Sequence, residues 1–385
     1  IGVSPLFLDS GLNSLFLPLL GVSTAYVVLM VCGVLLQASS NVSFGALQGL
    51  IPDLVPEDQR GRASGVKAVL ELAPVFLIIF MGPLVDAGQT GLTVAIIMAA
   101  LLVTMLITVL GVHEEPLQEK PSGGVRERVL RLIALTAIFV AVTQAAVWIV
   151  RFSGSLLASR GAPIGQQLAV VGLLGLVGMA GAVFVGVYLG AWVGIGKEAR
   201  KQTSFIWWVI NRLLFLAAVG SVQGFAQYYL GDVLHLPNPA TMTTVLLAVV
   251  GVFLIGSALG GGYLADRVRR RRLVALAGLC AAVGTFGLLF ADSLVLVLVC
   301  GSIIGLGAGT FMATNWALGT DLAPPEEAGR YLGISNLAGA GAGIVGAGIG
   351  GPIADFFNVL QPGLGYLVIF ALYAALFLLL SLIHI

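Results

Sequence analysis

The fold is decided by residues 239–272, which read PATMTTVLLAVVGVFLIGSALGGGYLADRVRRRR. The first part, 239–263, holds no charged residue and is long enough to cross the roughly 30 Å hydrocarbon core of a bilayer as one helix. The loop that follows, from Asp266 to Arg272, carries six charges, which are costly to place in hydrocarbon. The stretch therefore predicts a membrane-spanning helix that ends in a basic loop at the membrane surface.

The whole chain repeats this alternation of apolar run and charged loop. Of its 385 residues, 58% are hydrophobic and only 10% are charged, whereas soluble domains carry about 25% charged residues. The long, near-continuous runs exclude a β-barrel, whose strands alternate with period two. We therefore predict an all-α integral membrane protein surrounded by lipid bilayer. The net charge of +1 argues against a nucleic-acid partner, and the scattered Cys and His residues predict no disulfide framework, metal site or cofactor.

Apolar runs bounded by Pro, Gly or charge predict twelve spans. They are 2–21, 24–51, 62–85, 91–112, 129–150, 164–194, 204–230, 239–263, 273–291, 294–319, 331–354 and 363–384. When these helices alternate in direction, all Lys and Arg residues except Arg151, Arg160 and Arg212 fall on one side. An excess of basic residues marks the cytoplasmic side. We expect a monomeric multi-pass protein in the cytoplasmic membrane of a prokaryote, with its basic loops in the cytoplasm.

An internal repeat appears at an offset of 268–269 residues. The segment from Asp53 to Arg62 matches the segment from Asp321 to Arg330, and Gly82-Pro83-Leu84-Val85-Asp86 matches Gly351-Pro352-Ile353-Ala354-Asp355. Each copy is interpreted as a cytoplasmic loop, one helix and a Gly-Pro turn ending in Asp. The equal orientation of the copies predicts two halves related by an axis along the membrane normal. The same offset puts the counterpart of loop 264–272 before Ile1, so we expect two further helices upstream of this chain.

The motifs resemble those of a known family. Gly262-Tyr263-Leu264-Ala265-Asp266-Arg267 with its basic cluster resembles the signature loop of the major facilitator superfamily, and the loops Asp53–Arg62 and Asp321–Arg330 resemble that family's companion signature. Arg269 departs from the signature, which usually has glycine there, and a first-half copy of the signature is absent. The pair at 129–194 resembles the two central helices of fourteen-helix members. The second half is similar to sugar-cation symporter relatives.

The resemblance implies two pseudo-symmetric helical bundles with two inserted helices. Residues 1–112 would form four of the six helices of an N-terminal bundle. Residues 113–203 would form a linker with the two extra helices, and residues 204–385 a C-terminal six-helix bundle.

Polar residues within the spans are candidates for a solute pathway, because such groups are costly in hydrocarbon and usually have a partner or a role. In the family, the helices that hold most of them line a central cavity. The candidates are Gln37, Asn41, Gln48, Glu71, Arg212, Gln223, Gln227, Asn315 and Trp316. Glu71 is interpreted as either a proton- or cation-coupling group or a structural carboxylate. Arg212 either extends to the cytoplasmic interface, binds an anionic solute group or pairs with Glu71. For each of the uncharged polar residues the alternative is an interhelical hydrogen bond that only holds the bundle together.

Charged residues in the cytoplasmic loops are candidates for a gate. Several charge-assisted bonds across two bundles could bias an equilibrium between inward- and outward-facing states, although exposed pairs are individually weak. The alternative is charge that only sets the topology. The gate candidates are Asp53, Arg60, Arg62, Gly262, Asp266, Arg267, Asp321 and Arg330.

These features predict a secondary active transporter that moves a small solute by alternating access, with H⁺ or Na⁺ as candidate coupling ions. No Gly-x-x-x-x-Gly-Lys-Ser/Thr loop occurs in the sequence. Drug or lipid efflux by the same fold is the first alternative. A non-transporting membrane scaffold or a membrane-embedded enzyme is the alternative from another class. An enzyme would need a convergent catalytic set, which the sequence lacks.

Overall fold

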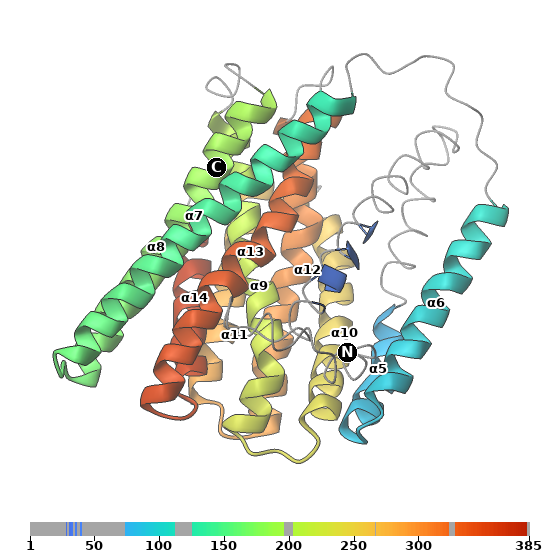
Figure 1. Ribbon diagram of the computed structural model, residues 1–385. Helices are drawn as coiled ribbons and strands as arrows, with labels where there is room; N and C mark the ends of the chain where they lie inside the picture. Colours follow the sequence, from blue (N-terminus) through green and yellow to red (C-terminus); the bar gives the residue numbers. More distant parts are fainter. Residues whose placement is uncertain are drawn as a thin grey trace. The chain divides into compact units, whose positions relative to one another are not determined.

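The computed structural model describes residues 28, 31–33, 35–36, 39–40, 74–111, 125–195, 203–265, 267–322 and 328–382 (Figure 1). Within these ranges every regular element is a helix, and nine helices are long and apolar enough to cross a membrane. The predicted all-α membrane fold is therefore confirmed. The predicted spans 2–21 and 24–51 lie largely outside the described residues, and so does the first half of the span 62–85. The chain divides into two compact units, Ile1–Leu117 and Gln118–Ile385, and each is described by itself.

In the first unit, two described helices form a hairpin. α5 (Pro74–Asp86) and α6 (Thr90–Gly111) are joined by a turn in which Gly88 takes a φ of 73°, a conformation that glycine adopts without steric cost. α6 is strongly apolar, with a mean hydropathy of 2.7, and most of its side chains are exposed. An apolar helix with so little protein cover is stable in lipid and not in water.

The second unit contains eight α-helices among its described residues. They are α7 (Val125–Ser159), α8 (Ile164–Ile195), α9 (Thr203–Asp232), α10 (Pro239–Ala265), α11 (Arg270–Gly287), α12 (Leu294–Leu322), α13 (Ala328–Leu360) and α14 (Leu364–Leu382), with a 3₁₀ turn, η3 (Leu288–Phe290), after α11. α12 packs between α10 and α11, while α13 packs against α9 and α11 against α14.

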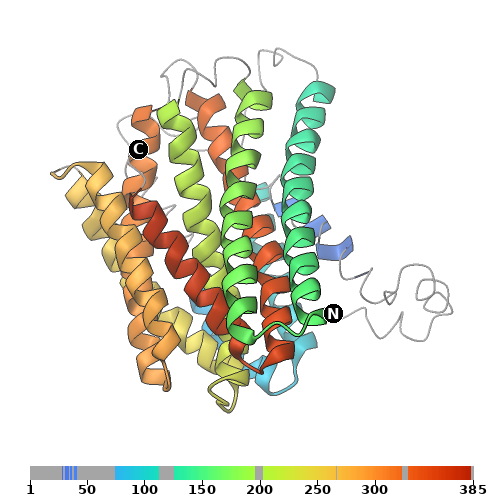
Figure 2. The same ribbon diagram turned by 90° about the vertical axis from the view of Figure 1, so that its left-hand side faces the viewer.

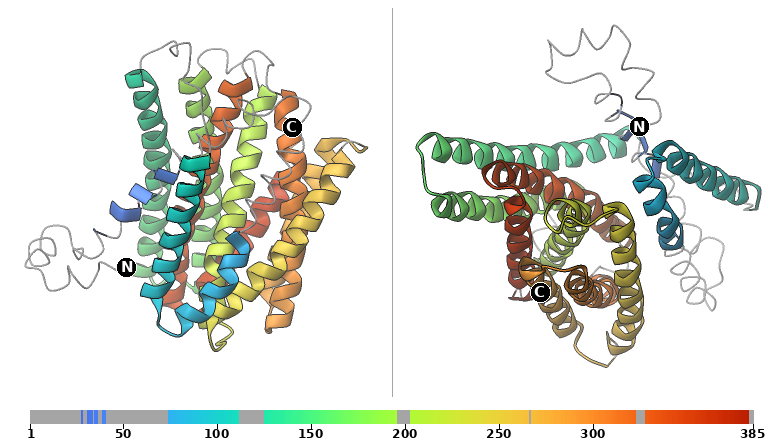
Figure 3. Two further views of the ribbon diagram at one scale, coloured as in Figure 1. Left: turned by 90° about the vertical axis from the view of Figure 1, so that its right-hand side faces the viewer. Right: turned by 90° about the horizontal axis from the view of Figure 1, so that it is seen from below.

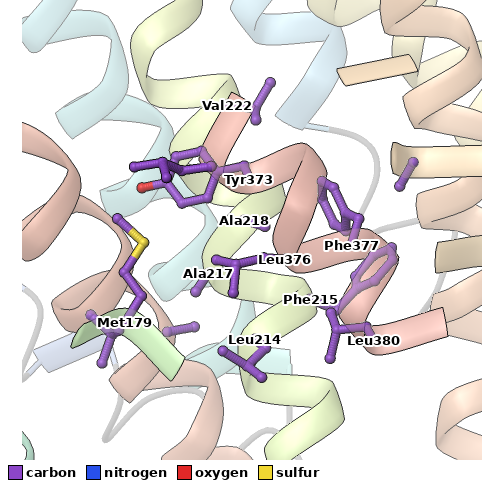
Figure 4. Packing of buried hydrophobic residues seen from close by; sticks show 14 of the residues in the cluster. Met179, Leu214, Phe215, Ala217, Ala218, Val222, Tyr373, Leu376, Phe377 and Leu380 are labelled. Atoms are coloured by element: carbon purple, nitrogen blue, oxygen red, sulfur yellow. The ribbon is translucent and has the colours of Figure 1, made fainter. Parts of the chain in front are cut away.

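α9 is the most buried of these helices, and most of its side chains are enclosed by the neighbouring helices. Its Phe215 stacks on Phe311 of α12, with ring centroids 3.6 Å apart. Phe215 also meets the edge of Phe377 of α14 (Figure 4). Large aromatic side chains from three helices therefore interlock around α9, and this packing fixes which face of α9 remains available for polar groups.

α7 and α8 run side by side as an antiparallel pair against α13 (Figure 2). Viewed along the helices, the pair lies at one edge of the unit (Figure 3, right). Small residues allow the close approach: a Cβ at Gly186 of α8 would lie 2.5 Å from Cε1 of Phe139 on α7, and one at Gly175 would lie 2.5 Å from Cδ1 of Ile353 on α13. Glycine at helix contacts is typical of packing in membranes, where close van der Waals contact replaces the hydrophobic effect as the driving force.

Two expectations drawn from the sequence are wrong. α7 runs to Ser159, so Arg151 lies inside a helix and not in a loop after residue 150. The Gly-Pro segments are not turns, because Pro83 lies within α5 and Pro352 within α13. Proline removes one backbone donor from a helix, but a bilayer helix tolerates it where neighbouring groups satisfy the freed backbone. Six residues before Pro352, the hydroxyl of Tyr373 donates a hydrogen bond of 2.9 Å to the carbonyl of Gly346, which joins α14 to α13.

Hydrogen bonds also join helix ends away from the basic loops. The hydroxyl of Tyr366, at the start of α14, donates to Oδ2 of Asp232 at the end of α9 over 2.6 Å. Tyr229 donates to the carbonyls of Leu288 and Ala291, where α11 passes through η3 to α12. These bonds connect α9 to α14 and to the α11–α12 turn, which restricts how α9 can shift within the unit.

Candidate functional site

One face of α9 is less buried than the rest of the helix and carries an arginine and two glutamines. Arg212, Leu216, Val219, Gln223 and Gln227 follow each other at helical spacing, so they form a single stripe. The first three are half-buried and the two glutamines are exposed, whereas most other positions of α9 are buried. The stripe extends for about 22 Å along the helix, at 1.5 Å per residue. The sequence placed three of these residues on a candidate pathway, and the structure puts all three on the same face.

Arg212 is bonded to the neighbouring helix α12. Its Nη1 donates to Oδ1 of Asn315 over 3.3 Å, and its guanidinium carbon lies 6.0 Å from the centre of the Trp208 ring. Two of the candidates singled out from the sequence, 103 residues apart in the chain, are thus in direct contact. Arg212 lies roughly two and a half turns into α9. A charged side chain at this depth in a bilayer helix is energetically costly unless it is hydrogen-bonded.

Trp208, one turn before Arg212 on α9, also connects α9 to α12. Its ring is fully buried, and its Nε1 donates a hydrogen bond of 2.8 Å to the backbone carbonyl of Asn315. A Cβ at Gly319, one turn further along α12, would overlap the Trp208 ring. Glycine at this position is therefore what allows the indole to lie against α12. Sequence reasoning missed this contact, because a tryptophan near a helix end is equally consistent with an interfacial anchor.

Asn315 leaves an unused donor. The residue is fully buried, and its Nδ2 finds no hydrogen-bond acceptor among the residues that the structure describes. A buried polar group without a partner costs about 1–3 kcal/mol, so such an atom usually marks a missing acceptor. Arg212 and Asn315 together offer N–H donors, which suit an oxygen-rich group such as a hydroxyl, carbonyl or carboxylate.

Asn211, next to Arg212 in sequence, has a different environment. Its Nδ2 donates to the carbonyl of Leu380 on α14 over 3.4 Å, and its side chain is only 1% exposed. It therefore faces into the second unit and is best explained as an interhelical bond that holds α9 against α14.

Several candidates cannot be placed. Trp316 lies in α12 but its side chain is not described, and the candidates that lie outside the described residues are Gln37, Asn41, Gln48 and Glu71. Their roles stay predictions.

The gate candidates are described only at the end of α10. Gly262 is half-buried, and the guanidinium carbon of Arg267 lies 4.2 Å from the centre of the Tyr263 ring, within the range of a cation–π interaction. Asp321 and Arg330 lie in α12 and α13, but their side chains are not described. The remaining four, Asp53, Arg60, Arg62 and Asp266, lie outside the described residues.

The bundle of apolar helices is typical of a multi-pass membrane protein, and the comparison with protein families agrees. Residues 191–347, which include both Arg212 and Asn315, match the model of the Major Facilitator Superfamily. The match covers less than half of the chain, and for this stretch the resemblance predicted from the signature loops is confirmed.

Two curated proteins are similar to parts of the chain. The glucose transporter GlcP of Staphylococcus epidermidis is 32% identical over 143 residues, which cover 36% of this chain and 31% of GlcP. The minor myo-inositol transporter IolF of Bacillus subtilis is 30% identical over 103 residues, which cover 26% of this chain and 24% of IolF. The chain thus matches less than a third of the length of either relative.

Proposed function

We propose that this protein is a secondary transporter that moves a small polar solute, of the sugar or polyol class, across a membrane by alternating access. The observation that carries the proposal is the contact between Arg212 and Asn315, a cluster of hydrogen-bond donors between two bilayer-length helices of a transporter-family domain. Sugars and polyols present many hydroxyl oxygens, which can accept from such donors. The similarity to a glucose transporter and a myo-inositol transporter supports the same solute class.

The stripe on α9 would extend the pathway away from Arg212. Gln223 and Gln227 can both donate and accept hydrogen bonds, so they suit a hydroxylated solute better than an apolar drug or a lipid. This difference favours solute transport over drug or lipid efflux. We further propose that Gln37, Asn41 and Gln48 line the same pathway from the first half, and that the charged loop residues around Asp266 and Arg267 act as its cytoplasmic gate.

The solute site is tested by Arg212→Gln in proteoliposomes with radiolabelled glucose and myo-inositol. A hydrogen bond to a charged group contributes about 1.5–3 kcal/mol, so saturable uptake should fall by about tenfold or more. Arg151→Gln is the matched control, because Arg151 is an exposed arginine within α7. If both variants take up solute as the parent does, Arg212 does not contribute to the pathway. That result would favour the interpretation that its side chain only extends to the cytoplasmic interface.

The scaffold alternative makes a different prediction. A protein without a hydrated pathway would take up neither solute, and cysteines introduced at Gln223 or Gln227 would not react with membrane-impermeant thiol reagents. Reaction at both positions that solute slows would contradict a scaffold, and the sugar-transporter relatives argue in the same direction.

We propose that Glu71 couples solute movement to H⁺, with Na⁺ as the alternative ion, in the cytoplasmic membrane of a prokaryote. A carboxyl group at mid-membrane depth can load and release a proton as the pathway opens to each side. Glu71→Gln cannot ionise, so it should abolish uptake driven by a pH gradient while sparing solute exchange at equal pH on both sides. Glu119→Gln, between the predicted spans 91–112 and 129–150, is the control. If the Glu71 variant still concentrates solute under a pH gradient as the parent does, Glu71 is a structural carboxylate and not the coupling group.

A further inference from the structure

The turn between α10 and α11 carries a dense positive charge, of which the proposed gate uses only Arg267. Five of the six residues from Arg267 to Arg272 are arginines. Four of the five are exposed, and Arg270 is half-buried. So many like charges within six residues repel each other, and this repulsion falls when an anionic group lies next to them.

The start of α11 adds to this positive field. Arg269 occupies the N-cap position without a side-chain hydrogen bond to the helix, and the first turn of α11 holds no acidic residue. The N-terminus of a helix carries a partial positive charge, which favours anions and disfavours cations. Arginines in the first turn are therefore unfavourable for the helix itself, and their cost falls when negative charge lies next to them.

Below the arginines, the outer face of α11 is a continuous apolar strip. Leu276, Leu279, Val283 and Phe286 follow Arg272 at helical spacing and are 53%, 44%, 55% and 54% exposed. The opposite face packs on α12 and α14. From Arg272 the strip continues to Phe290, about 27 Å along the helix axis, which is close to the thickness of a hydrocarbon core.

Charge and strip together match one kind of molecule. A free phosphate ion would use the arginines but not the strip, and an uncharged lipid would use the strip but not the arginines. An anionic phospholipid has a negative headgroup and acyl chains on the same molecule, so it fits both. Tyr263, exposed beside Arg267, lies where aromatic side chains commonly meet the headgroup layer.

We propose that the α10–α11 turn and the outer face of α11 form a binding site for an anionic phospholipid, with the headgroup at Arg267–Arg272 and the acyl chains along Leu276–Phe286. This site lies apart from the Arg212–Asn315 contact, so it does not depend on the proposed solute class. Clusters of four or more basic residues at a membrane surface attract acidic lipids through the field of the headgroups.

Cys280, exposed on α11, allows a local test. A fluorophore is attached to Cys280 in the full chain carrying Cys32→Ser and Cys300→Ala, and the protein is placed in phosphatidylcholine bilayers. Quenching by a small fraction of dibrominated phosphatidylglycerol is compared with quenching by dibrominated phosphatidylcholine. We expect about a tenfold enrichment of the anionic lipid around α11, which falls as salt is raised.

Variants and competitors separate the outcomes. Changing Arg269, Arg270, Arg271 and Arg272 to Gln should bring the enrichment down to the bulk value, changing them to Lys should retain most of it, and Arg151→Gln with Arg160→Gln should leave it unchanged. Glycerol phosphate, a headgroup without acyl chains, should not displace the lipid. The proposal is overturned by equal quenching from the two lipids in the parent protein, by unchanged enrichment in the Gln variant, or by displacement with glycerol phosphate. The parent measurement and its salt dependence need no variant, so they decide the matter even if the Gln variant misfolds.

Discussion

At the scale of single residues, the contact of Trp208 with α12 determines where Asn315 lies. The indole is fully buried, donates to the Asn315 carbonyl and rests on the bare backbone at Gly319. Because this contact is one turn away from Asn315 on the same helix, it fixes the rotation of α12 that brings the Asn315 amide to Arg212. A glycine without any polar function therefore supports the polar site.

Gly319→Ala should disturb this arrangement, because its Cβ would overlap the Trp208 ring. Overpacking of a close contact costs about 1–3 kcal/mol, so we expect a lower midpoint of thermal unfolding in detergent together with weaker solute uptake. Gly343→Ala is the matched control: no heavy atom lies within 4 Å of its Cβ position, and alanine favours a helix over glycine. An unfolding midpoint for the Gly319 variant equal to that of the control would show that Trp208 can move aside freely.

The polar residues of the site could be found in the sequence, but their contact could not. Arg212 and Asn315 are conspicuous because they interrupt apolar runs, and the cost of polar groups in lipid makes each a candidate. Whether they meet depends on how α9 and α12 are rotated, and this rotation follows from side-chain packing such as the stacking of Phe215 on Phe311. Such packing is not visible in hydropathy. The same limit applies to Asn211, which faces α14 although it is adjacent to Arg212.

At the scale of helices, the nine spans that the described residues contain were predictable, because a bilayer imposes a minimum apolar length. The end of α7 was not predictable, because Arg151 interrupts the apolar pattern although the helix continues to Ser159. A single exposed arginine near a membrane surface can extend its charged end into water while its backbone stays helical. The Gly-Pro segments misled for a related reason, because proline ends helices in water far more often than in lipid.

The pairing of α7 with α8 depends on glycines whose effect can be measured. Gly186→Ala would bring a Cβ to 2.5 Å from Cε1 of Phe139, so the two helices must separate or the ring must turn. We expect a loss of about 1–3 kcal/mol in stability, seen as a lower unfolding midpoint. Gly181→Ala, on the same helix with no heavy atom within 4 Å, should leave the midpoint unchanged. Equal midpoints for the two variants would contradict the close packing of the pair.

At the scale of the whole molecule, the arrangement of the second unit bears on alternating access. α7 and α8 pack on α13, and α13 packs on α9, which carries Arg212. Between α7 and α13, bulky rings lie on glycines of the facing helix: Phe139 lies against Gly341 and Phe356 against Gly154. Thr143 approaches Gly348 in the same contact, so the two surfaces interlock and oppose sliding. This packing suggests that the helix pair moves together with the six helices from α9 to α14 during transport.

A disulfide between α7 and α13 tests this rigid coupling and, like the uptake assays, rests on the proposed transport function. A Cβ at Gly348 would lie 3.2 Å from Cγ2 of Thr143, so cysteines at both positions come within bonding range. In a chain whose native cysteines Cys32, Cys280 and Cys300 are replaced, oxidation of the Thr143→Cys, Gly348→Cys double variant should form the bond, detected as protection of both thiols from alkylation. Uptake should continue at the rate of the reduced form, because the bond joins two parts that move together. The single variants, treated with the same oxidant, control for damage elsewhere. Uptake that stops on oxidation and returns on reduction would mean that the pair slides against α13, and the helices from α7 to α14 would then move as two bodies.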